Sequence, residues 1–147
     1  AREFDEMASQ SAVGSGGVLF LPEQARGETA WIGRGERHDR CRAVLEGIGF
    51  ALRRLLEEDL GLDRDCPLCA IGGGSRSAIW MQMAADITGR PVRVGTGDAL
   101  LGAAILAAGL SKTPQCSEQI VFQPHPEHHE VYDKIYTRWK AAWRRDQ

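Results

Sequence analysis

The sequence predicts an α/β domain, because short apolar segments alternate with longer amphipathic ones along its 147 residues. The runs at 17–22, 66–71 and 91–94 have the length of buried strands. Apolar residues recur at three- and four-residue steps in the segments that follow, as in helices with one packed face. A content of 43% apolar and 26% charged residues fits a single globular domain, which we expect to span residues 1–147.

The first forty residues predict little regular structure. Residues 3–10 resemble the end of a helix, and 12–17 form a glycine and serine linker that leads into the strand at 17–22. Residues 23–40 are polar and contain three glycines, so we expect a shortened surface loop there. A loop of that length in a compact domain is either a functional segment or a plain solvated connection.

The helix that begins at Cys41 has the clearest periodicity in the chain. Its predicted inner face comprises Cys41, Val44, Leu45, Ile48, Ala51, Leu52, Leu55 and Leu56. We expect the ion pairs of Arg42 with Glu46 and of Arg53 with Glu57 on the outer face, and Gly61 in a left-handed cap. Gly47 and Gly49 cost about 1 kcal/mol each relative to alanine inside a helix. Their presence predicts another backbone close by.

A three-glycine turn, Gly72 to Gly74, follows the strand at 66–71 and precedes a helix that ends at Gly89. Glycines let a ligand approach the backbone, and Ser75 or Ser77 can cap the helix that follows. The turn matches neither G-x-x-x-x-G-K-[ST] nor G-x-G-x-x-G. The residues alone leave a nucleotide site and a tight packing turn equally open.

The last third predicts one more strand and two helices. A strand at 91–94 is followed by a buried helix of small residues at 100–108. Asp98 is more simply explained as the cap of this helix than as a general base. Residues 112–123 are expected to form a loop with an apolar patch at 120–122, and the helix from Pro126 carries Trp139 and Trp143 on its packed face.

No metal site is predicted. Cys66-x-x-Cys69 lacks a second cysteine pair, so these thiols are expected to be buried and reduced in a strand. His125, His128 and His129 could ligate a metal, but they occupy a helix start that favours polar residues, and two histidines at helical spacing still need a third ligand.

The net charge of −2 and the scattered basic residues give no case for nucleic acid or a membrane surface as a partner. There is no secretory peptide and no apolar run long enough to span a membrane, so we expect a cytoplasmic protein. The chain starts without methionine, which suggests a piece of a longer protein.

Several segments together resemble the carboxy-terminal domain of the FGGY carbohydrate kinases. The resemblance covers roughly residues 12–143 in the family's order, and its most specific stretches are Gly17–Pro22, Arg42–Phe50, Gly72–Ser77, Gly89–Val92 and Leu101–Gly109. It implies an actin-like, ribonuclease-H-like α/β domain with a central mixed sheet flanked by helices. It also implies that this domain supplies the nucleotide side of an ATP site.

The resemblance assigns Gly72, Gly73, Gly74, Ser75 and Ser77 to cofactor binding, with Gly73 and Gly74 against the nucleotide and Ser77 near the adenine. Mg²⁺ would be held mostly by the nucleotide and by an amino-terminal sugar-binding domain absent from this chain. The family's catalytic aspartate also precedes residue 1, so no catalytic residue is assigned here. The segment from Gly27 to Arg40 is shorter than in the family.

The resemblance predicts an ATP-dependent kinase that phosphorylates a hydroxyl of a pentulose or related polyol, with this chain alone inactive and a homodimer left open. The competing hypothesis is a non-enzymatic actin-like assembly module with a vestigial nucleotide site. A weaker third hypothesis is a metal-binding module built on Cys66, Cys69 and the histidines.

Overall fold

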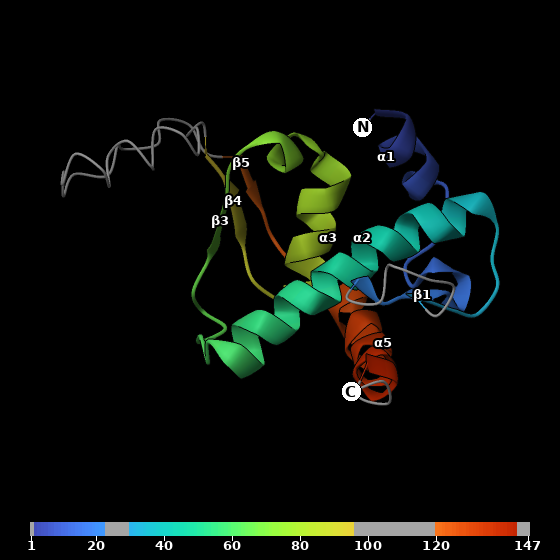
Figure 1. Ribbon diagram of the computed structural model, residues 1–147. Coiled ribbons are helices and arrows are strands. Elements are labelled where there is room, and N and C mark those ends of the chain that lie inside the picture. Colours follow the sequence, from blue (N-terminus) through green and yellow to red (C-terminus); the bar gives the residue numbers. More distant parts are fainter. Residues whose placement is uncertain (1, 23–29, 96–119, 144–147) are drawn as a thin grey trace, which may run out of the picture.

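The computed structural model describes residues 2–22, 30–95 and 120–143. Helix α2 (Arg37–Arg54) crosses the middle of Figure 1 and is the element around which the others pack. Three further α-helices of the described residues contact it: α1 (Arg2–Ser9), α3 (Ala78–Thr88) and α5 (Pro126–Trp143). None of the described helices is both long and apolar enough to cross a membrane.

Three short strands form a mixed sheet in the order β3-β4-β5, with α3 lying between that sheet and α2 (Figure 1). Strands β3 (Leu68–Ala70) and β4 (Val92–Val94) are parallel, and β5 (Ile120–Phe122) pairs antiparallel with β4. A second, antiparallel pair joins β1 (Leu19–Phe20) to β2 (Trp31–Ile32). The predicted combination of a mixed sheet and flanking helices is therefore present.

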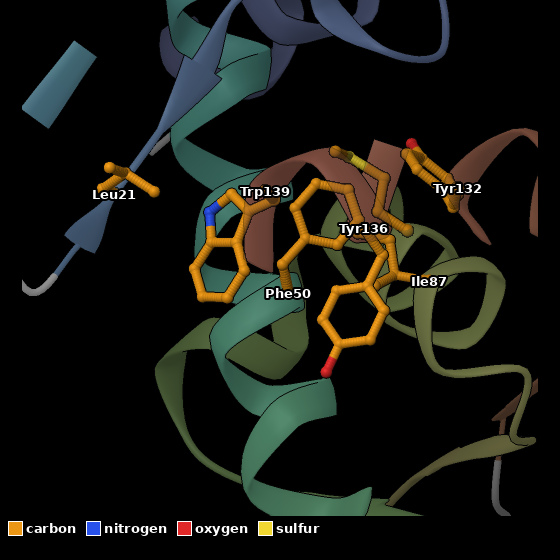
Figure 2. Close-up of a cluster of buried hydrophobic side chains, with 7 residues drawn as sticks. Leu21, Phe50, Ile87, Tyr132, Tyr136 and Trp139 are labelled. Atoms are coloured by element: carbon orange, nitrogen blue, oxygen red, sulfur yellow. The ribbon is translucent and has the colours of Figure 1, made fainter. Parts of the chain in front are cut away.

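The main hydrophobic core lies where α2, α3 and α5 meet, and Figure 2 shows its side chains. Phe50 of α2 is the central ring, with the rings of Tyr132, Tyr136 and Trp139 of α5 at centroid distances of 5.9–6.0 Å. Ile87 of α3 packs against the same cluster. The stripe predicted for the last helix is thus correct at Trp139, which is fully buried, whereas Trp143 is half-buried.

Helix α2 buries a different face from the one that its apolar periodicity predicted. The buried face carries Arg42, Glu46 and Arg53, whereas Ile48 and Leu55 of the expected inner face are 41% and 42% exposed. The predicted ion pairs do form, at 2.8 Å for Arg42–Glu46 and 3.0 Å for Arg53–Glu57. The small residues between these charges give the face its close packing, and polar partners satisfy the charges. Periodicity alone could not reveal this.

The buried carboxylate of Glu46 holds the segment before β1 in place. It accepts hydrogen bonds from the backbone N–H of Gly14 at 2.9 Å and from the Ser15 hydroxyl at 2.7 Å. Arg42 Nε and the Tyr132 hydroxyl donate to the same carboxylate. Burial raises the pKa of Tyr132, and the neighbouring negative charge of Glu46 raises that pKa further.

Gly47 meets its prediction of a close backbone, and Gly49 does not. A Cβ on Gly47 would lie 2.3 Å from the carbonyl oxygen of Phe20 in β1. A Cβ on Gly49 would instead meet a side chain, that of Ile87, at 2.6 Å. Beyond Arg54 the helix continues as one π-helical turn over Leu55–Asp59, and Gly61 follows with the predicted left-handed backbone, at φ +58°.

Three further expectations are wrong within the described residues. The range 23–40 is not all loop, because it contains β2 and the first turn of α2. Residues 120–122 form strand β5 rather than a loop patch, since their backbone pairs with β4. Cys66 and Cys69 are exposed, not buried. In β3 the two neighbours of Cys69 pack toward α3, so the alternation of a strand points Cys69 the other way.

Other expectations fall outside the described residues. These are the helix at 100–108, the cap at Asp98, and the parts of the predicted loops at 23–29 and 112–119.

Candidate nucleotide site

The glycine turn is a compact structure of its own between β3 and α3. Gly72 has a φ of +89°, a left-handed value that a side chain would strain. A short 3₁₀ turn then spans Gly73–Arg76. The Ser75 hydroxyl donates to the carbonyl of Gly72 at 2.8 Å and closes the turn. The sequence suggested that the glycines lead directly into the helix, but the 3₁₀ turn separates them from it.

Ser77 is the residue that begins α3. Its Oγ accepts a hydrogen bond from the backbone N–H of Trp80 at 3.2 Å, the standard geometry of an N-terminal cap. Of the two serines considered for this role, Ser77 fills it. Gly89 ends the same helix with a φ of +67°, as predicted.

A hollow of about 790 Å³ opens on one side of the turn. Its wall comes from α1, α2, the turn and the start of α3, and comprises Arg2, Phe4, Asp5, Leu45, Gly73, Gly74, Arg76, Ser77 and Trp80. A volume of this size is in the range of small-molecule and cofactor pockets.

Gly73 and Gly74 leave their side of the hollow open. A Cβ built on Gly73 would have no heavy atom within 4 Å, and one on Gly74 would meet only Trp80 Cδ1, at 4.0 Å. The backbone here can be approached directly by a flat ligand, and a branched side chain would occupy that space.

The structure brings together three of the five predicted site residues. Gly73, Gly74 and Ser77 line the hollow. Ser75 instead lines a smaller neighbouring hollow of about 280 Å³, and Gly72 lines neither of the two. Ser75 and Gly72 have a structural role instead, because the hydrogen bond from the Ser75 hydroxyl to the Gly72 carbonyl shapes the turn.

Several wall residues were not predicted from the sequence. Leu45 belongs to the apolar face of α2 that was expected to be buried, and it is half-exposed because that helix buries a different face. Arg76 is exposed, and within the described part of the chain it makes no ion pair. Its position within the glycine–serine turn was the feature of the sequence from which a cation at this site could have been predicted.

Residues 2–110 match the model of the FGGY family of carbohydrate kinases, C-terminal domain. The chain belongs to this family. This confirms the resemblance noted in the sequence, and the actin-like α/β fold of the FGGY kinases with it.

Curated relatives include xylulose kinase of Staphylococcus epidermidis, 32% identical over 97% of this chain and 34% of the relative. Another is autoinducer-2 kinase of Enterobacter sp., 32% identical over 95% of this chain and 31% of the relative. Among solved structures, a xylulose kinase from Brucella ovis is 28% identical, with a TM-score of 0.74 over 97% of this chain and 35% of the other. The chain thus spans about a third of the length of these FGGY kinases.

Proposed function

We propose that this chain is the nucleotide-binding domain of an ATP-dependent kinase that phosphorylates a hydroxyl group of a pentulose or a related polyol. The observation that carries the proposal is the open hollow over Gly73 and Gly74 in a chain of the FGGY carboxy-terminal family. The substrate class follows from the relatives, which include xylulose kinases; xylulose is a pentulose.

The wall of the hollow offers different chemistry to the parts of a nucleotide. Leu45 and Trp80 present half-exposed apolar surface on which a purine can lie. Ser77 Oγ already accepts from the helix backbone, so its hydroxyl proton is free to donate to a ring nitrogen. These contacts would select and orient the base.

The charged residues suit the phosphate end. Arg76 lies at the wall as an exposed cation, where it can offset the charge of phosphoryl oxygens. Asp5 is the carboxylate in the wall of the hollow, which is too little to hold Mg²⁺ without other ligands. We therefore infer that Mg²⁺ is bound mainly through the nucleotide and through the part of the kinase that precedes this chain.

In phosphoryl transfer, positioning and neutralisation of charge supply most of the rate acceleration. The role of this chain would be to place ATP, which provides the γ-phosphoryl group. The catalytic base and the sugar site would belong to the preceding domain. Asp98, the acidic residue after the last predicted strand, lies outside the described residues and is given no role.

The test is an assay of ADP release by the intact protein with ATP and a panel of ketoses and polyols. We expect turnover with at least one pentulose, and Arg76→Gln should raise the KM for ATP several-fold without changing the KM for the sugar. Arg93→Gln is the matched control, because Arg93 is exposed on β4 and does not line the hollow. Absence of turnover with every sugar would instead favour the non-enzymatic assembly module.

A further inference from the structure

Three potential metal ligands converge at the junction of α3 and α5, apart from the residues that line the glycine-turn hollow. They are Asp86 near the end of α3, His125 just before α5, and His128 in its first turn. One ligand atom from each lies within 4.8 Å of the others. This cluster contains no cysteine, and Asp86 supplies the third ligand that the histidines lacked in the sequence.

Hydrogen bonds hold the carboxylate of Asp86 with both of its oxygens near the histidines. Its side chain is 4% exposed, and Oδ1 accepts hydrogen bonds from the backbone N–H of His125 at 2.8 Å and from the Gln82 amide at 2.9 Å. Oδ2 faces His128 Nδ1 at 2.9 Å and His125 Nδ1 at 3.3 Å, and His125 Nδ1 also lies 3.2 Å from Oδ1 and 3.0 Å from Gln82 Nε2. Carboxylates that ligate a metal are typically oriented by such hydrogen bonds.

Both imidazoles direct their Nδ1 atom toward Asp86 Oδ2. In a tetrahedral zinc site with bonds near 2.0–2.1 Å, neighbouring nitrogen and oxygen ligands lie about 3.4 Å apart. The two separations from Asp86 Oδ2 already agree with this spacing within roughly half an ångström. The histidine side chains are 48% and 39% exposed, so water can reach a fourth position.

The first turn of α5 is docked onto Asp86 by a separate contact. His129 Nδ1 lies 2.8 Å from the backbone carbonyl of Asp86 and donates to it. Gly89 makes room for that ring, since a Cβ there would lie 2.7 Å from His129. This contact fixes the helix start and therefore brings His128, one residue earlier, to the carboxylate before any metal binds.

We propose that Asp86, His125 and His128 bind one divalent transition-metal ion of the zinc class, with water as the fourth ligand. Two imidazoles and one carboxylate suit Zn²⁺ rather than Mg²⁺, which prefers oxygen ligands and keeps its waters. The ion binds between the Asp86 carboxylate and the Nδ1 atoms of the two imidazoles. It joins α3 to the start of α5 as a structural clamp, and it is separate from the Mg²⁺ that accompanies ATP.

The test is a titration of Zn²⁺ into the metal-free intact protein, followed by calorimetry and by the melting temperature. We expect one equivalent to bind and to raise the melting temperature. His125→Gln and His128→Gln should each weaken binding at least tenfold. His38→Gln is the matched control, because it removes a histidine of α2 that lies outside the cluster, and it should leave the affinity unchanged.

Two results would overturn the proposal. One is that the wild-type protein binds no zinc. The other is that zinc binding survives the double change His125→Gln with His128→Gln and is lost instead in Cys66→Ser with Cys69→Ser, which would assign the metal to the exposed thiols. Co²⁺ absorption separates the two, since thiolate ligands give an intense charge-transfer band that imidazole and carboxylate lack.

Discussion

Glu46 is a buried charged residue of α2 whose hydrogen bonds join α2 to α5 and to the segment before β1. Its side chain is 2% exposed, and its carboxylate accepts hydrogen bonds from the side chains of Arg42, Tyr132 and Ser15 and from the backbone N–H of Gly14. A second i,i+4 pair of opposite sign, Glu130 with Lys134 on α5, has side chains 75% and 73% exposed and a separation of 3.1 Å. Equal spacing in sequence thus gives two pairs in very different solvent environments.

Glu46→Ala should therefore lower the free energy of unfolding by about 3–5 kcal/mol, because it leaves the Arg42 guanidinium buried without its partner. Glu130→Ala, at the exposed pair, should change that free energy by no more than about 0.5 kcal/mol. Urea denaturation of both variants provides the measurement. Similar losses in the two would show that burial does not distinguish these pairs.

At the scale of elements, the backbones of α2 and β1 approach each other closely at Gly47. The carbonyl of Phe20 lies against Gly47 and also accepts the indole N–H of Trp139 at 2.8 Å. That single oxygen connects β1, α2 and α5. Space for a carbonyl at this point requires the absence of a side chain on α2.

Gly47→Ala should destabilise the protein by about 1–3 kcal/mol through overpacking. The sign is informative, since alanine in place of glycine normally stabilises a helix by about 1 kcal/mol. Gly73→Ala is the control: the added methyl enters open space, so the free energy of unfolding should move by less than about 0.5 kcal/mol. Thermal and urea melts that show Gly47→Ala as neutral would contradict the close contact.

The sequence predicted those elements that have strong local signals. The helices at 41–56, 78–88 and 126–143 follow from apolar periodicity, and Ser77 and Gly89 from capping chemistry. Strands β2 and β5 were missed because two or three residues carry no periodicity and depend on a partner strand for pairing. The buried face of α2 was missed because its charges are satisfied by residues distant in sequence.

The candidate sites divide in the same way. Gly73, Gly74 and Ser77, which line the hollow, could be assigned through the family resemblance because the turn is local in sequence. The proposed metal site could not be completed from the sequence, since its third ligand, Asp86, precedes the first histidine by 39 residues and meets it only when α5 docks on α3. Contacts between distant segments are set by the fold.

At the scale of the whole molecule, we propose that this chain places a nucleotide and depends on the rest of an FGGY kinase for chemistry. Leu45 and Trp80 line the hollow and also pack against the hydrophobic core, so the wall of the proposed nucleotide site is fixed to the core through α2 and α3. A change confined to the turn should then alter nucleotide affinity without altering stability.

The most direct measurement is calorimetry of ADP binding to the intact protein and to Gly73→Val. Valine would fill the open side of the hollow, and we expect at least a tenfold loss of affinity, about 1.4 kcal/mol, with an unchanged melting temperature. Ala78→Val, an exposed position that does not line the hollow, should bind ADP as the wild type does. Unchanged ADP affinity in Gly73→Val would contradict a nucleotide site at this turn.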